Sequence, residues 1–183
     1  MSVLYLPPCP TDCSAAVEDV LFNDCTPELN WGEVSKLYMV GSDFPGFADV
    51  TDYAEWLIHL HQTDDNKIRE LTIIGELPEA EITEIPYSGD RIAIGFKTFN
   101  LNFEIDETNE TNYNFLLMSE CGGKFKIWFE TSNGLLFGGN DGIEASVRLN
   151  PMIPRERTAL HKFMGKATWK SLKSPFRCTM PTA

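Results

Sequence analysis

The sequence predicts a mainly β fold, either a β-sandwich or a barrel-like structure of two packed sheets, with one or two short flanking helices and extended terminal arms. Segments in which apolar and polar residues alternate recur from about residue 68 onward, and turn-forming residues separate them. Helical spacing of apolar residues is confined to short stretches. The 183 residues are 43% hydrophobic and include 12 Phe, 5 Tyr and 4 Trp, which is enough apolar surface for one core.

A strand and a helix are the first elements expected in the core. Residues 33–40 fit a strand that ends at a loop containing glycine and proline. Apolar side chains at i, i+3, i+4 and i+7, counted from Tyr53, then predict an amphipathic helix over 52–61. Asp49 or Thr51 can cap its N-terminus. The apolar stripe of this helix is expected to face the core.

Further strands and one more helix are expected after this helix. The predicted strands span 71–75, 80–85, 91–96, 97–105, 124–131, 135–137 and 143–149. Capping side chains at 106–109 precede a second helix at 113–118, and two glycines end it. Beyond residue 151 the pattern is ambiguous, with a helix or turn at 155–164 and a last strand at 167–172.

The chain is expected to have three parts that differ in charge. Residues 1–30 form an N-terminal arm interrupted by prolines, with a short helix at 15–22; residues 31–150 form the β-rich core; residues 151–183 form a basic C-terminal arm that packs on the core or on a neighbour. Residues 1–150 hold 26 acidic and 8 basic residues, a balance of −18, and residues 151–183 hold 7 basic and 1 acidic, a balance of +6, which together give the net charge of −12.

This division of charge favours contact between copies of the chain, because each copy offers both halves of a complementary pair. The basic residues beyond 151 are spread out, which suits a long interface better than a phosphate pocket. The candidate interface residues are Arg155, Arg157, Lys162, Lys166, Lys170, Lys173 and Arg177. The negative net charge argues against sequence-specific recognition of nucleic acid.

Histidines and cysteines offer few groups for catalysis or metal binding. His59 and His61 lie two residues apart, so on a helix their rings point about 200° apart and cannot share one metal. The five cysteines are odd in number and scattered, which favours reduced thiols over a disulfide framework. A zinc site at Cys9, Cys13 and Cys25 is the alternative, although their spacing is not that of paired Cys-x-x-Cys knuckles.

Motifs for enzymes are also missing. The sequence has no Gly-x-Ser-x-Gly, phosphate-binding loop, His-Glu-x-x-His or dinucleotide-binding glycine motif. The glycine-rich residues 138–142 are expected to form an ordinary loop rather than a calcium-binding turn. We therefore expect no enzyme, no catalytic, cofactor-binding or metal-binding residues and no cofactor. A small hydrolase or isomerase that uses Asp106 and Glu107 is the alternative.

The order of these elements resembles the tail tube, or major tail, proteins of tailed bacteriophages. The resemblance is carried by the helix at 52–61, the strand at 97–105 with its following helix, the strands within 124–149 and the basic tail, and it covers about residues 31–172. It concerns architecture and includes no short motif. That family has two packed β-sheets, a flanking helix, a terminal arm and a long loop or hairpin that reaches a neighbour. This chain departs from the plan in its cysteine-bearing start and in having no obvious long insertion.

The resemblance implies a structural subunit of the virion. Its copies would form rings that stack into a tube, and DNA would pass through an acidic lumen without specific binding. Its partners would be copies of itself and other virion proteins, after synthesis in the host cytoplasm. No segment is long and apolar enough for a membrane span. Capsid decoration, head-to-tail connection and tail termination remain open as other virion roles.

A β-sandwich module that binds carbohydrate or a protein partner is the alternative from a different class. In such a module an exposed tryptophan serves as a stacking platform. The candidates are Trp31, Trp56, Trp128 and Trp169.

Overall fold

The computed structural model describes residues 32–87, 91–120, 123–156 and 160–182. The expected N-terminal arm and the helix at 15–22 lie outside these residues. Within them the chain forms nine strands and two helices. Their bounds are β1 Val34–Gly41, α1 Tyr53–His61, β2 Arg69–Glu76, β3 Glu81–Tyr87, β4 Arg91–Ile105, α2 Glu110–Glu120, β5 Lys124–Thr131, β6 Leu135–Phe137, β7 Ile143–Met152, β8 Lys162–Ser171 and β9 Arg177–Thr179.

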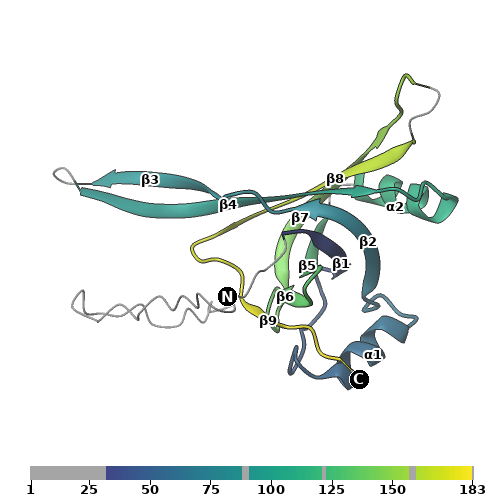
Figure 1. Ribbon diagram of the computed structural model, residues 1–183. Helices are drawn as coiled ribbons and strands as arrows, with labels where there is room; N and C mark the ends of the chain where they lie inside the picture. Colours follow the sequence, from purple (N-terminus) through teal and green to yellow (C-terminus); the bar gives the residue numbers. More distant parts are fainter. Residues whose placement is uncertain (1–31, 88–90, 121–122, 157–159, 183) are drawn as a thin grey trace, which may run out of the picture. The chain divides into compact units, whose positions relative to one another are not determined.

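Six of the described strands close into an antiparallel β-barrel (Figure 1). Their order is β1-β2-β4-β8-β7-β5, and β1 also pairs with β5, which closes the barrel. β6 pairs with β5, and β9 pairs with β6. The predicted mainly β class with short helices is confirmed. One closed sheet takes the place of the two packed sheets that the sequence suggested.

The strand β4 belongs both to the barrel and to a hairpin that projects from it. Its residues 91–98 pair with β3, whereas residues 97–105 pair with β8. β3 and the first half of β4 therefore extend beyond the barrel (Figure 1). Two predicted strands, 91–96 and 97–105, are one continuous strand of 15 residues. The alternating patterns predicted the strands of this hairpin but not that it projects from the barrel, because a projecting strand and a barrel strand share the same pattern.

The strand β8 lies between β4 and β7 in the barrel wall. The boundary expected at residue 150 falls inside β7, and the expected C-terminal arm contains this barrel strand. From the sequence, the first residues of β8 are compatible with a helix or turn as well as a strand, because Gly165 has no side chain and interrupts the alternation of apolar residues. The ring of Phe103 occupies that space, and a Cβ at Gly165 would overlap it.

Two hydrophobic clusters stabilise the described part of the chain. The first fills the barrel with alternate residues of its strands, including Leu101, Ile127 and Val147. The second lies on the outer face of β1 and β5, where α1 and its neighbouring loops cover Tyr38 and Trp128. Strands β1 and β5 are therefore buried on both faces, whereas β7 and β8 alternate between buried and exposed residues. None of the helices in the described residues is long and apolar enough to cross a membrane.

Candidate subunit-contact surface

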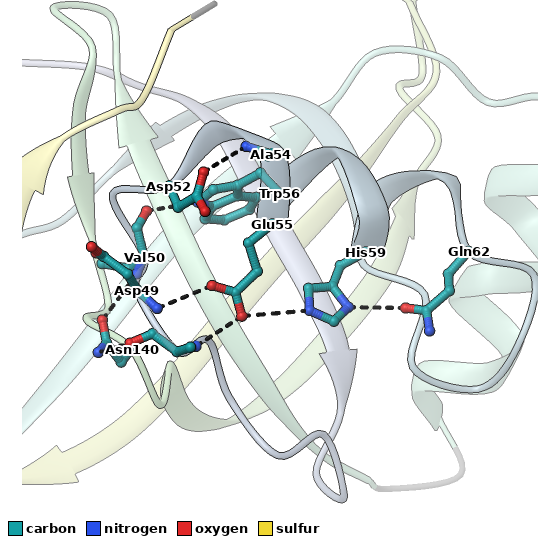
Figure 2. A network of polar contacts seen from close by, with 10 residues as sticks. Asp49, Val50, Asp52, Ala54, Glu55, Trp56, His59, Gln62 and Asn140 are labelled. Atoms are coloured by element: carbon teal, nitrogen blue, oxygen red, sulfur yellow. Dashed lines mark hydrogen bonds and ion pairs between the residues drawn. The ribbon is translucent and has the colours of Figure 1, made fainter.

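A polar network fixes the loop before α1 (Figure 2). The side chain of Asp52 caps the helix by accepting a 2.9 Å hydrogen bond from the Ala54 N–H. This corrects the expected caps, since Asp49 instead accepts hydrogen bonds from the backbone and hydroxyl of Thr51. Glu55 accepts hydrogen bonds from the backbone N–H groups of Ala48 and Asp49, at 2.8 and 3.0 Å. The carboxylate of Glu55 therefore holds backbone in place.

The two histidines of α1 lie at the edge of this network. The Nε2 atom of His59 is 4.0 Å from Glu55 and its Nδ1 atom is 2.9 Å from the Gln62 side chain. His61 is exposed, and its Nδ1 atom is 2.8 Å from the Leu57 carbonyl. The two rings contact different groups, as their spacing predicted.

The glycine-rich loop at 138–142 packs on Trp128 and forms part of the same covered face. Trp128 donates a 2.7 Å hydrogen bond to the Gly139 carbonyl, and a Cβ at Gly138 or Gly142 would overlap the Trp128 ring. The side chain of Asn140 accepts a hydrogen bond from Val50 and donates one to the backbone of the loop before α1. The packing of Trp128 against this loop therefore explains its glycine-rich sequence.

A pocket of about 500 Å³ lies between β2 and the end of β4. Its carboxylates are Glu70, Glu104, Asp106 and Glu107. Three of them form ion pairs, Glu70 with Lys36 at 2.8 Å, and Glu104 and Asp106 with Lys162 at 2.9 and 3.3 Å. The described residues contain no group of three or more His, Cys, Asp or Glu suited to a metal ion. The zinc alternative at Cys9, Cys13 and Cys25 lies outside them.

A row of exposed cations lies on the outer face of β7 and β8. Arg148 and Lys166 are directly opposite each other in the ladder, and Lys170 follows on the same face of β8. We call these three residues the cationic stripe. Among the residues that the structure describes, none of the ion pairs involves them. Like charges directly opposite each other across two strands destabilise a sheet. The stripe therefore costs the isolated chain stability.

Of the seven candidate interface residues, the structure places two, Lys166 and Lys170, in this stripe. Lys162 differs, because its ammonium group pairs with the carboxylates of Glu104 and Asp106, and these hydrogen bonds raise its pKa above the ordinary lysine value. Of the remaining four, three lie away from the stripe and one lies outside the described residues. Arg155 is exposed in the β7–β8 connection, Lys173 is half-buried after β8, Arg177 is exposed on β9, and Arg157 lies outside the described residues.

Sequence reasoning missed Arg148 as a member of this surface. Its alternation with the apolar residues of β7 was visible, and it predicted an outward side chain. However, Arg148 lies before the basic segment that begins at residue 151, so the division of charge along the chain does not point to it. The register of β7 with β8, which pairs Arg148 with Lys166, was needed to bring the two together.

A second exposed surface is the projecting hairpin of β3 and β4. The side chains of Ile82, Ile85 and Phe96 are each about half exposed, at 50, 50 and 54%. β3 pairs on one side only, with β4, so its other edge is open in the described structure. Its exposed carboxylates, Glu81 and Glu84, make that edge acidic.

Comparisons with known proteins assign no function to these surfaces. No protein-family model, no curated protein and no solved structure matches the chain.

Proposed function

We propose that this protein is a self-assembling structural subunit of a bacteriophage virion, a tail tube protein whose copies form stacked rings around an acidic lumen that conducts DNA. The observation that carries the proposal is a barrel with two surfaces left without internal partners among the described residues. These are the cationic stripe and the apolar, open-edged hairpin.

The hairpin supports assembly because a two-stranded ribbon is marginally stable in water by itself. An open strand edge also invites pairing with another chain, and half-exposed Ile82, Ile85 and Phe96 add apolar area for such a contact. The resemblance to tail tube proteins implies a loop or hairpin that reaches a neighbour, and this hairpin fits that role.

The charge of the chain supports a conduit for DNA. With a net charge of −12, the surface repels phosphate and does not anchor the polymer. The cations that do exist are in part committed within the chain, since Lys36, Lys124 and Lys162 pair with carboxylates.

The carbohydrate-binding alternative loses three of its four candidate platforms. Trp56, Trp128 and Trp169 are 1, 0 and 5% exposed, so none can stack on a sugar. Trp31 lies outside the described residues. Other virion roles, namely capsid decoration, head-to-tail connection and tail termination, use the same contact surfaces and remain second candidates.

Electron microscopy and native mass measurement of the purified protein test the proposal. We expect rings or tubes of uniform diameter at high concentration and low salt, and weaker assembly at high salt, because salt screens exposed charge pairs. Single closed rings without stacking would favour a connector or terminator. A monomer at every concentration, indifferent to ionic strength, would contradict self-assembly.

A further inference from the structure

We propose that the cationic stripe of one copy binds the acidic β3 strand of a second copy. This inference rests on the proposed function and deepens it, since it names the two surfaces that meet. The occupant of the stripe is thus a second copy of this chain, seated through the open edge of its projecting hairpin.

The β3 strand carries charge of one sign. Residues 76–87 contain four glutamates and no lysine or arginine. Glu81 lies opposite Thr98, and Glu84 lies opposite a β4 residue four positions earlier. Side chains alternate along a strand, so Glu81 and Glu84 lie on opposite faces of the ribbon, on either side of its open edge. An edge-on approach therefore presents both carboxylates to the same partner.

A bulge shapes the apolar part of this ribbon. Between the pairs of Ile82 with Lys97 and of Glu84 with the next β4 partner, β4 contains one residue more than β3. Gly95 lies at the bulge, and a Cβ there would come within 3.1 Å of the Ile85 side chain. Ile85 and Phe96 consequently share one face with Glu81, and Ile82 lies on the other. Each carboxylate thus has an apolar neighbour on its own face.

The stripe offers the complementary pattern. None of its three cations has a carboxylate partner in the described ion pairs. The outward residues of β8 that lie beside and between Lys166 and Lys170 are neutral. Met152 and Met164, exposed at 47 and 37%, supply apolar contact beside it. A partner carboxylate near Arg148 and Lys166 would relieve their mutual repulsion.

The spacing of the charges also agrees. Lys166 and Lys170 are about 13 Å apart along β8, at about 3.3 Å per residue. Glu81 and Glu84 are about 10 Å apart along β3 by the same rise. Flexible lysine side chains bridge the difference.

A charge-swap experiment tests the pairing. The variant Lys166→Glu with Lys170→Glu changes the net charge from −12 to −16, and Glu81→Lys with Glu84→Lys changes it to −8, since each substitution shifts the charge by two. All four substitutions together restore −12. We expect each pair of reversals to raise the concentration needed for assembly about tenfold or more, and the fourfold variant to assemble like the wild type, in sedimentation velocity.

Matched controls separate the pairing from net charge. Lys67→Glu with Arg69→Glu and Asp43→Lys with Asp65→Lys change exposed residues away from both surfaces by the same −4 and +4, and we expect little change in assembly. Denaturant unfolding checks that each variant folds. Should the reversal on β8 prevent folding, Lys166→Gln with Lys170→Gln replaces it, with the same expected loss of assembly.

Photo-crosslinking supplies an independent readout. With p-benzoylphenylalanine in place of Ile82, mixed with an isotope-labelled copy, we expect intermolecular crosslinks to residues 162–171. A wild type that assembles, with no effect of the reversals or with crosslinks elsewhere, overturns this pairing and leaves self-assembly intact. A strictly monomeric wild type overturns both. If the wild type binds duplex DNA and the β8 reversal abolishes that binding, the pairing is also overturned, because the stripe would then bind phosphate.

Discussion

The two outer faces of this barrel differ in what covers them. On the face of β1 and β5, Tyr38 and Trp128 are almost completely buried beneath α1 and its loops, where Trp56 of α1 packs against both rings. The polar side-chain atoms of all three form hydrogen bonds. On the face of β7 and β8, Arg148 and Lys166 are exposed and oppose each other across the ladder. The first face is covered by other parts of the chain, whereas the second leaves its cations exposed and without ion pairs among the described residues. The covered face therefore contributes to the stability of the fold, and the exposed face is the one available to the contact proposed above.

The largest effect is expected from a substitution that removes the side chain at the centre of the covered face. We expect Trp128→Ala to lower the free energy of unfolding by about 3–5 kcal/mol, because it leaves a cavity and removes the hydrogen bond from the indole N–H to the Gly139 carbonyl. Denaturant unfolding measures this loss. Phe96→Ala, on the projecting hairpin, is the control, and we expect a change within about 0.5 kcal/mol. Similar losses for both would mean that the two regions do not differ in this way.

A second substitution tests the packing inside the wall that both faces share. Gly165→Ala places a methyl group against the Phe103 ring, so we expect a loss of about 1–3 kcal/mol in the free energy of unfolding. A smaller residue in place of Phe103 would relieve part of it. Gly41→Ala, where a Cβ meets no atom within 4 Å, is the matched control. An unchanged midpoint for Gly165→Ala would contradict the close contact.

The covered face also predicts a dependence on alkaline pH. Burial, followed by the hydrogen bond to Glu130, raises the pKa of Tyr38 well above the ordinary tyrosine value. The unfolded chain then releases this proton first, so stability is complete below about pH 10 and falls above it. Between about pH 9 and 11 we expect the wild type to lose about 1 kcal/mol more than Tyr38→Phe. Parallel pH profiles of the two proteins would contradict the raised pKa.

The smallest effect belongs to the open face and has the opposite sign. We expect Lys166→Gln to raise the stability of the monomer by up to about 0.5 kcal/mol, because it removes one of two opposed like charges. Its gain should shrink with added salt. Lys162→Gln, which breaks ion pairs with Glu104 and Asp106, is the control and should not stabilise. A loss of monomer stability in Lys166→Gln would show that the stripe has a partner within the chain.

Much of the fold follows from local patterns in the sequence. The strands at 124–131 and 135–137 match the predicted bounds of β5 and β6, and the helix at 52–61 begins one residue before α1. These elements carry strong alternation or helical spacing, and clear turns separate them. The three-residue β9 was missed because a strand so short depends on pairing with β6.

The candidate site was less predictable, because it depends on which residues of different strands are neighbours. Lys162 and Lys166 look alike in the sequence, yet the first forms ion pairs with Glu104 and Asp106 and the second has no ion pair among the described residues. The closure of the barrel likewise depends on the pairing of β1 with β5, whose residues lie about 90 positions apart along the chain. No local pattern records that pairing.

The position of β8 in the wall also determines when the chain can finish folding. It is the last of the six described barrel strands in sequence order, yet it sits between β4 and β7. Until its residues have left the ribosome, both of those strands lack a neighbour, so a nascent or truncated chain exposes two unsatisfied edges at once. Barrel closure must therefore come late in biosynthesis, and premature termination before residue 162 should yield an aggregating fragment.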